Sequence, residues 1–89
     1  MAHISDNGGA AAARADNGNQ RGYKSTYFEG GIHVSGFITS PLLPKKVRGS
    51  EFHGLMGVAD WLPTLVLGVA GMPIKGIPTD GFNMWNAIR

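Results

Sequence analysis

Apolar and polar residues alternate along residues 32–40, and this period of two predicts a β-strand. One face would carry Ile32, Val34, Gly36 and Ile38, and the other His33, Ser35, Phe37 and Thr39. Pro41 and Pro44 follow, and since proline cannot donate to a sheet ladder, we expect the strand to end there. Three shorter segments are also predicted to be extended: residues 1–5, as the tail of a strand, residues 23–28, and residues 55–59.

A helical period replaces this alternation after Asp60. Two adjacent apolar stripes have a spacing of four residues: Trp61, Leu65 and Val69, and Leu62, Val66 and Ala70. Asp60 suits the N-cap, and Pro63 falls in the first turn, where a missing N–H costs nothing. Gly71 is expected to close the helix. The two stripes make a wide apolar face, more than a small chain by itself can cover.

The other segments are predicted to be loops, with one more short helix near the C-terminus. The predicted loops are residues 8–20, the basic connector 44–51, and the Pro/Gly-rich stretch 72–79. Asp80 is expected to cap the last helix, with Trp85 and Ile88 facing inward. Trp61 and Trp85 are interpreted as core aromatics.

Composition limits how stable such a chain can be. Its 89 residues include 14 glycines and no cysteine. A chain of this size buries only about 60–65% of the surface that its unfolded state exposes, and the glycines add backbone entropy that the core must offset. No disulfide or cysteine-based metal site can compensate. We therefore expect an incomplete core.

Charge and hydropathy argue against two classes of partner. The formal net charge of +2 gives no case for nucleic acid, and the cluster Lys45, Lys46 and Arg48 is interpreted as a solvated loop. The apolar stretch 62–72 is shorter than the ~20 residues that a membrane span needs. Residues 1–4 lack the basic and apolar regions of a signal peptide, so none is expected.

Residues 6–9, Asp-Asn-Gly-Gly, are the first candidate for chemistry. A carboxylate and an amide oxygen are hard ligands for a divalent cation, and the glycines permit the backbone to bend so that both can be used. A lysine from the following loop, Lys24, could reach an anion held on that cation. From these residues alone, an Asx-turn at a strand end and a solvated lysine remain open.

Three blocks in order along the chain resemble the type I sulfatases of the alkaline-phosphatase superfamily. The blocks are residues 5–9 with 21–32, residues 36–43, and residues 59–65 with 80–85. The resemblance is nearest to the arylsulfatase B-like branch, which includes N-acetylgalactosamine-4-sulfatase. It implies an α/β fold, a mixed sheet flanked by helices, of which residues 1–89 would be a partial, middle-to-late segment of the catalytic domain.

The resemblance also implies a function and a site. Asp6 and Asn7 match two ligands of the family's Ca²⁺, and Lys24 matches its sulfate-binding lysine. The family's nucleophile is a cysteine converted to formylglycine, and the chain has no cysteine. The resemblance therefore predicts part of a calcium-dependent enzyme that hydrolyses sulfate esters of small molecules or glycans, with lysosomal or secreted residence. The 89 residues alone are expected to be inactive.

Two departures and two alternatives accompany this interpretation. His33 stands where many family members carry arginine, and Gly57 where the branch often places histidine. Glu29 is expected to fix the turn before the strand, and Arg14 and Arg21 to face solvent. One alternative is a hydrolase of phosphate or phosphonate esters from the same superfamily. The other is an inactive relic that binds a partner or a polyanionic glycan through its basic loop.

Overall fold

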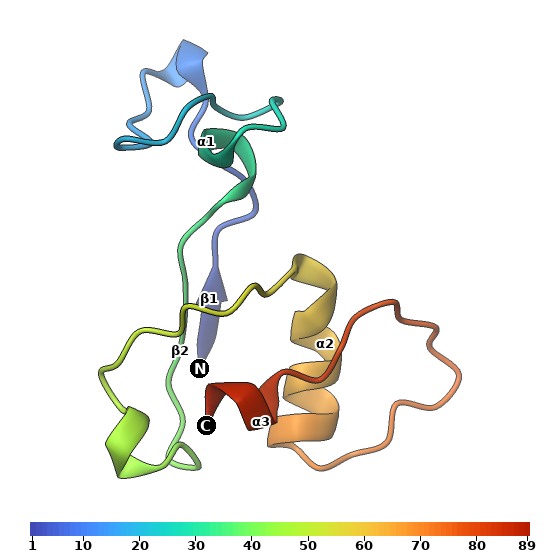
Figure 1. Cartoon of the computed structure of the whole chain (residues 1–89). Helices are drawn as coiled ribbons and strands as arrows, with labels where there is room; N and C mark the ends of the chain where they lie inside the picture. The colour runs from blue at the N-terminus through green and yellow to red at the C-terminus, as the bar shows by residue number, and fades with distance from the viewer. The chain divides into compact units, whose positions relative to one another are not determined.

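The computed structural model describes every residue, Met1–Arg89, and divides the chain into two compact units, Met1–Thr39 and Ser40–Arg89 (Figure 1). The strands and helices are β1 (Ala2–Ile4), α1 (Glu29–Ile32), β2 (Gly36–Ile38), α2 (Trp61–Pro63) and α3 (Trp85–Ile88). Short 3₁₀ turns cover Ala11–Ala13, Lys45–Val47 and Val58–Asp60. None of the helices has both the length and the apolar character to cross a membrane.

The first unit begins with a two-stranded antiparallel sheet. Ala2 pairs with Ile38, and Ile4 pairs with Gly36. At the centre of this register, the rings of His3 and Phe37 stack with their centroids 5.5 Å apart. A predicted strand at the N-terminus is therefore confirmed, and the sheet is compatible with a fragment of the larger sheet that the resemblance implies.

The second strand is much shorter than the alternation predicts. The prediction covered residues 32–40, but only Gly36–Ile38 pair, and Ile32 closes α1. The cause is a helical turn: Ile32 N–H donates to Phe28 O at 3.2 Å, and His33 N–H donates to Glu29 O at 2.8 Å. Those donors are thus used within the turn and cannot pair with a strand.

Two further predicted extended segments are also wrong. Residues 23–28 form a turn, in which Thr26 N–H donates to Tyr23 O at 3.0 Å. Residues 55–59 have no partner strand, and their end belongs to a 3₁₀ turn. A short apolar pattern can favour an extended backbone, but a β-strand also needs a neighbouring strand to pair with.

Four glycines, Gly8, Gly22, Gly30 and Gly31, pack backbone against backbone in the first unit; we call them the glycine junction. Gly8 N–H donates to Gly31 O at 2.9 Å, and Gly30 N–H donates to Arg21 O at 2.8 Å. A Cβ on Gly8 would overlap the Gly30 carbonyl, and one on Gly30 would overlap the Gly22 carbonyl. The junction therefore depends on the absence of side chains at these positions.

A helix that crosses from α to π geometry organises the second unit. α2 continues directly into a π-helical stretch, Thr64–Val69, and Gly71 follows at φ 65°. This confirms the predicted helix and its glycine end. α3 lies against the helix, where a Cβ on Gly68 would overlap Trp85, and Trp85 is only 5% exposed.

Asp60 stands at the predicted N-cap position of α2, but its side chain makes no hydrogen bond to the helix and instead joins the segments around Gly57 and Phe82. Its Oδ2 accepts the N–H of Gly57 at 2.8 Å, and its Oδ1 accepts the N–H of Phe82 at 2.8 Å. One turn later, Thr64 is fully buried, and its Oγ1 accepts the N–H of Met84 at 2.9 Å. We call these three hydrogen bonds, accepted by Asp60 and Thr64, the Asp60–Thr64 clamp.

The short helix α3 begins after the clamp. Its first N–H, on Trp85, donates to Asn83 Oδ1 at 3.0 Å, so Asn83 takes the capping role that was predicted for Asp80. The inward position of Trp85 is confirmed, and Ile88 is half-buried.

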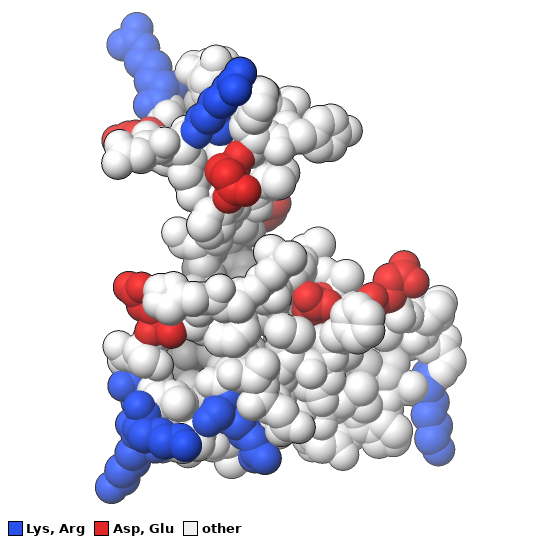
Figure 2. Space-filling model, viewed as in Figure 1, with Lys and Arg blue, Asp and Glu red and all other residues white.

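Very little apolar side-chain area is buried. Leu43 and Trp85 are the buried hydrophobic residues, and the second unit leaves many large ones exposed: Leu42, Phe52, Leu55, Val58, Leu62, Leu65, Leu67, Met72, Ile77 and Phe82. The face seen in Figure 2 is accordingly mostly uncharged. Exposed apolar area on this scale is typical of surfaces that contact other protein, and it agrees with the expected incomplete core.

The glycine junction leads to a first prediction. Gly30→Ala should lower the free energy of unfolding of the first unit by about 1–3 kcal/mol, because the new methyl group meets a backbone carbonyl that cannot rotate away. Gly57→Ala is the control, since its Cβ would lie 3.6 Å from Asp60 Oδ2, an ordinary contact. Denaturant unfolding followed by NMR signals of β1 and β2 measures the difference. Equal loss in both variants would contradict the junction.

The clamp leads to a second prediction. The backbone N–H groups of Phe82 and Gly57 hold the pKa of Asp60 below its usual value of 3.8, because both donate to the charged carboxylate. A carboxyl whose pKa is lowered on folding stabilises the folded state fully at pH values above its unfolded-state pKa. This stabilisation is lost as the pH falls through its folded-state pKa. The second unit should therefore lose this stabilisation below about pH 3.8.

Asp60→Asn should be less stable than the parent at neutral pH and should lack this acid-dependent loss. Thermal midpoints between pH 2 and 7, followed by the fluorescence of Trp61 and Trp85, measure both effects. Asp80→Asn is the matched control, since Asp80 lies outside the clamp. Identical pH profiles for the parent and Asp60→Asn would show that the clamp contributes nothing.

Candidate functional site

The Asp6–Asn7 pair lies directly after β1, where the chain bends. Asp6 is exposed and Asn7 is half-buried. The backbone carbonyl of Asn7 accepts Ser5 Oγ at 3.1 Å, while neither side chain enters a salt bridge. The next residue, Gly8, is buried in the glycine junction. The junction thus fixes the backbone at the end of the bend and leaves the carboxylate open to solvent.

Lys24 lies in a turn that is held next to this bend. Its N–H donates to Gly9 O at 3.0 Å, two residues beyond Asn7. Thr26 closes the turn, because its Oγ1 donates to Tyr23 O at 2.7 Å and accepts from Tyr23 N at 3.2 Å. The Lys24 side chain is exposed and forms no salt bridge. The structure therefore brings the backbones of the predicted metal ligands and the predicted anion ligand together.

Asn17 is the residue of this site that sequence reasoning missed. Its Oδ1 accepts the N–H of Gly9 at 2.7 Å, and its Nδ2 lies 3.2 Å from Gly9 O and 3.2 Å from Gly22 O. One side chain therefore joins the segment after Asn7 to the segment before Lys24. The available signal was Asn17-Gly18, which is typical of a turn, and Gly18 does have φ 61°.

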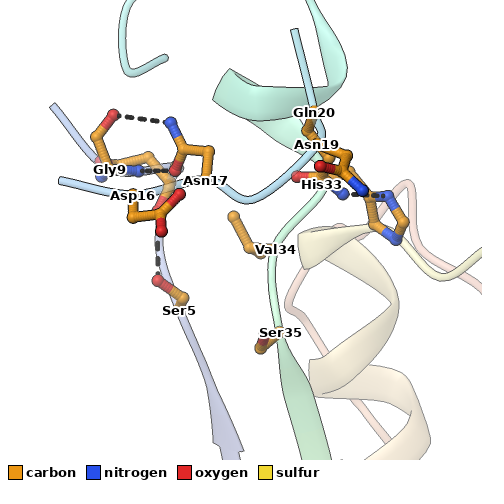
Figure 3. A pocket seen from close by; sticks show the side chains of 11 residues that line it. Ser5, Gly9, Asp16, Asn17, Asn19, Gln20, His33, Val34 and Ser35 are labelled. Atoms are coloured by element: carbon orange, nitrogen blue, oxygen red, sulfur yellow. Dashed lines mark hydrogen bonds between the residues drawn. The ribbon is translucent and has the colours of Figure 1, made fainter. Parts of the chain in front are cut away.

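A polar cavity of about 640 Å³ lies beside the bend (Figure 3). It is lined by Ser5, Asn7, Gly8, Gly9, Asp16, Asn17, Asn19, Gln20, His33, Val34 and Ser35. Of the predicted site residues it includes Asn7, but not Asp6 or Lys24. On its far wall Gln20 Nε2 lies 2.9 Å from His33 Nδ1, and the same ring nitrogen lies 2.9 Å from Glu29 Oε2.

Two arginines, Arg21 and Arg48, make contacts within the chain. Arg21 is exposed, as predicted, and its guanidinium lies 4.0 Å from the centre of the Phe28 ring, a cation–π geometry. Arg48 donates to Leu43 O and to Pro41 O, both at 2.9 Å. The predicted basic loop therefore presents Lys45 and Lys46 to solvent, while the guanidinium of Arg48 is bonded to its own loop.

The donors at the bend suit Ca²⁺ in type, but are few. Asp6 and Asn7 offer a carboxylate and an amide oxygen, whereas Ca²⁺ takes six to eight oxygens. The chain contains no group of three or more His, Cys, Asp or Glu side chains that could hold a metal ion. Any Ca²⁺ at this bend would need most of its ligands from outside the chain.

Comparison with known proteins shows similarity to an arylsulfatase. No family model matches the chain, and no solved structure matches it. Arylsulfatase J of Mus musculus is 43% identical over 86 residues, which are 97% of this chain but only 14% of the mouse protein. The chain is therefore similar over nearly its whole length to one segment of an arylsulfatase, and this similarity supports its relation to the sulfatase family.

Proposed function

We propose that the chain is a segment of a calcium-dependent sulfatase in which Asp6 and Asn7 bind Ca²⁺ and Lys24 binds the sulfate group. One observation carries the proposal: the hydrogen bond from Lys24 N–H to Gly9 O, which holds the lysine turn beside the Asp6–Asn7 bend. The 43% identity to a segment of arylsulfatase J supports the reaction class, the hydrolysis of a sulfate ester.

Ca²⁺ would supply positive charge to the oxygens of the bound sulfate. Asp6 is exposed, so its carboxylate can reach a cation without losing an existing ion pair. Asn7 follows it on the same bend and contributes a neutral oxygen, which hard cations accept. The buried Gly8 keeps the backbone between this pair and the junction in one conformation, so that the ligands are held before the ion binds.

Lys24 would contribute a second positive charge to the sulfate. An ammonium group that contacts an anionic oxygen makes charge-assisted hydrogen bonds, which are stronger than neutral ones. The same group stabilises negative charge as it develops on the leaving oxygen. Because Lys24 forms no salt bridge within the chain, its charge is available for this role.

The segment does not supply every part of the reaction. The chain has no cysteine, so a formylglycine nucleophile would have to come from elsewhere in the enzyme. The substrate would be a sulfated small molecule or glycan, and the parent enzyme would be lysosomal or secreted, as the resemblance to the sulfatases implies. The 89 residues alone should hydrolyse no sulfate ester.

A chimera tests this proposal. The 86 matched residues of arylsulfatase J are replaced by those of this chain, and hydrolysis of an aryl sulfate is measured beside the unaltered mouse protein. We expect the chimera to be active, and Lys24→Ala in the chimera to lower kcat/KM by about 10²-fold or more, as the loss of one transition-state electrostatic contact does. Lys75→Ala, in the Pro/Gly-rich loop, is the matched control and should leave the activity unchanged.

Other outcomes separate the alternatives. A folded chimera that hydrolyses aryl phosphate but not aryl sulfate would favour the phosphate or phosphonate hydrolase. A folded chimera with neither activity, beside an active mouse protein, would contradict the catalytic proposal. It would leave the inactive binding relic, for which only Lys45 and Lys46 offer free cations in the basic loop.

A further inference from the structure

We infer that Asn17 is a positioning residue that sets where Lys24 lies relative to the Asp6–Asn7 bend. The expected effect on sulfate binding rests on the proposed function, whereas the hydrogen bonds of Asn17 do not depend on it. The three hydrogen bonds of the Asn17 amide join Gly9, which follows the bend, to Gly22, which precedes the lysine turn. Figure 3 shows the Asn17 side chain directed at Gly9, with the two hydrogen bonds between these residues drawn.

Gly9 is the link between Asn17 and Lys24. Its N–H donates to Asn17 Oδ1, and its carbonyl lies 3.2 Å from Asn17 Nδ2 and accepts the N–H of Lys24 at 3.0 Å. Asn17 therefore orients the carbonyl that holds the backbone of the lysine. Its third bond, to the Gly22 carbonyl, holds the same loop two residues before Lys24.

An amide is the side chain that this position requires. The three bonds use one acceptor oxygen and two N–H donors, and asparagine is the smallest residue that offers both. A carboxylate of the same shape would keep the acceptor, but it would place negative charge against the carbonyls of Gly9 and Gly22. A residue that only fills space would tolerate that isosteric change, whereas a residue that acts through its donors would not.

Hydrogen exchange in the full 89-residue chain tests the geometry. In Asn17→Ala the protection factors of the Gly9 and Lys24 amides should fall about tenfold or more, since the bonds that order both are lost. Asn19→Ala, a neighbouring exposed asparagine outside the proposed ligand set, should leave them unchanged. Protection at Ser5 and Thr39, whose N–H groups donate to Ser35 O and Met1 O, reports that the first unit of each variant remains folded.

Asn17→Asp distinguishes the hydrogen-bonding role from a purely structural one. At neutral pH the Lys24 amide should lose protection as it does in Asn17→Ala, because the Nδ2 donors to the carbonyls of Gly9 and Gly22 are gone, whereas the Gly9 amide keeps its acceptor oxygen. Below about pH 4, where an ordinary aspartate is protonated, the new carboxyl regains one donor and protection should partly return. This pH-dependent rescue keeps the test decisive even if Asn17→Ala unfolds the first unit.

A titration with inorganic sulfate in the presence of Ca²⁺ tests the consequence, followed by the NMR signal of the Lys24 amide. The dissociation constant should rise about fivefold or more in Asn17→Ala, and not in Asn19→Ala. If the parent chain shows no response to sulfate while exchange at Gly9 and Lys24 accelerates in Asn17→Ala, the positioning role stands, and the chimera decides the proposed function.

Three results would overturn the inference. One is unchanged protection at Gly9 and Lys24 in Asn17→Ala. Another is full protection of the Lys24 amide in Asn17→Asp at neutral pH, which would mean that the Nδ2 donors hold nothing. A parent chain that responds to sulfate, together with an Asn17→Ala variant that responds equally, would also remove the positioning role while leaving the proposed function intact.

Discussion

The close approach of backbone to backbone at the glycine junction is the constraint on which the first unit depends. Gly8, Gly30 and Gly31 are buried, and each lies where a Cβ would overlap a carbonyl or a neighbouring backbone atom. This packing brings three segments together: the bend after β1, the loop that carries Lys24, and α1. Without it, the predicted metal ligands and the predicted sulfate ligand would have no common location.

Polar contacts rather than a large apolar core organise both units. In the first unit an amide, Asn17, links two loop segments; in the second, Asp60 and the buried Thr64 hold the segment before α3. Each of these side chains bonds to backbone groups, which have fixed directions. Such contacts specify geometry well but contribute modestly to stability, and this fits a chain that covers only 14% of its mouse relative's length.

The sequence predicted some elements of the fold and missed others for identifiable reasons. Local signals identified β1, the long helix and its end at Gly71, because these depend on spacing and on glycine at positive φ. The strand over residues 32–40 was overestimated, because α1 takes up the N–H groups of Ile32 and His33. Asp60 is the N-cap residue of α2, but it makes no capping bond, because its carboxylate accepts the N–H of Phe82, far along the chain.

The sequence by itself determined which residues could carry the chemistry. Asp6 and Asn7 were recognisable as hard oxygen donors, and Lys24 as a cation, from residue type and from the resemblance to the sulfatases. Only the tertiary structure decided that Lys24 is held at Gly9 and that Asn17 arranges this contact. The physical reason is that residue type sets what a group can bind, whereas the meeting of distant backbone groups depends on packing between segments. Here that packing depends on glycines, at positions where the neighbouring backbone leaves no room for a side chain.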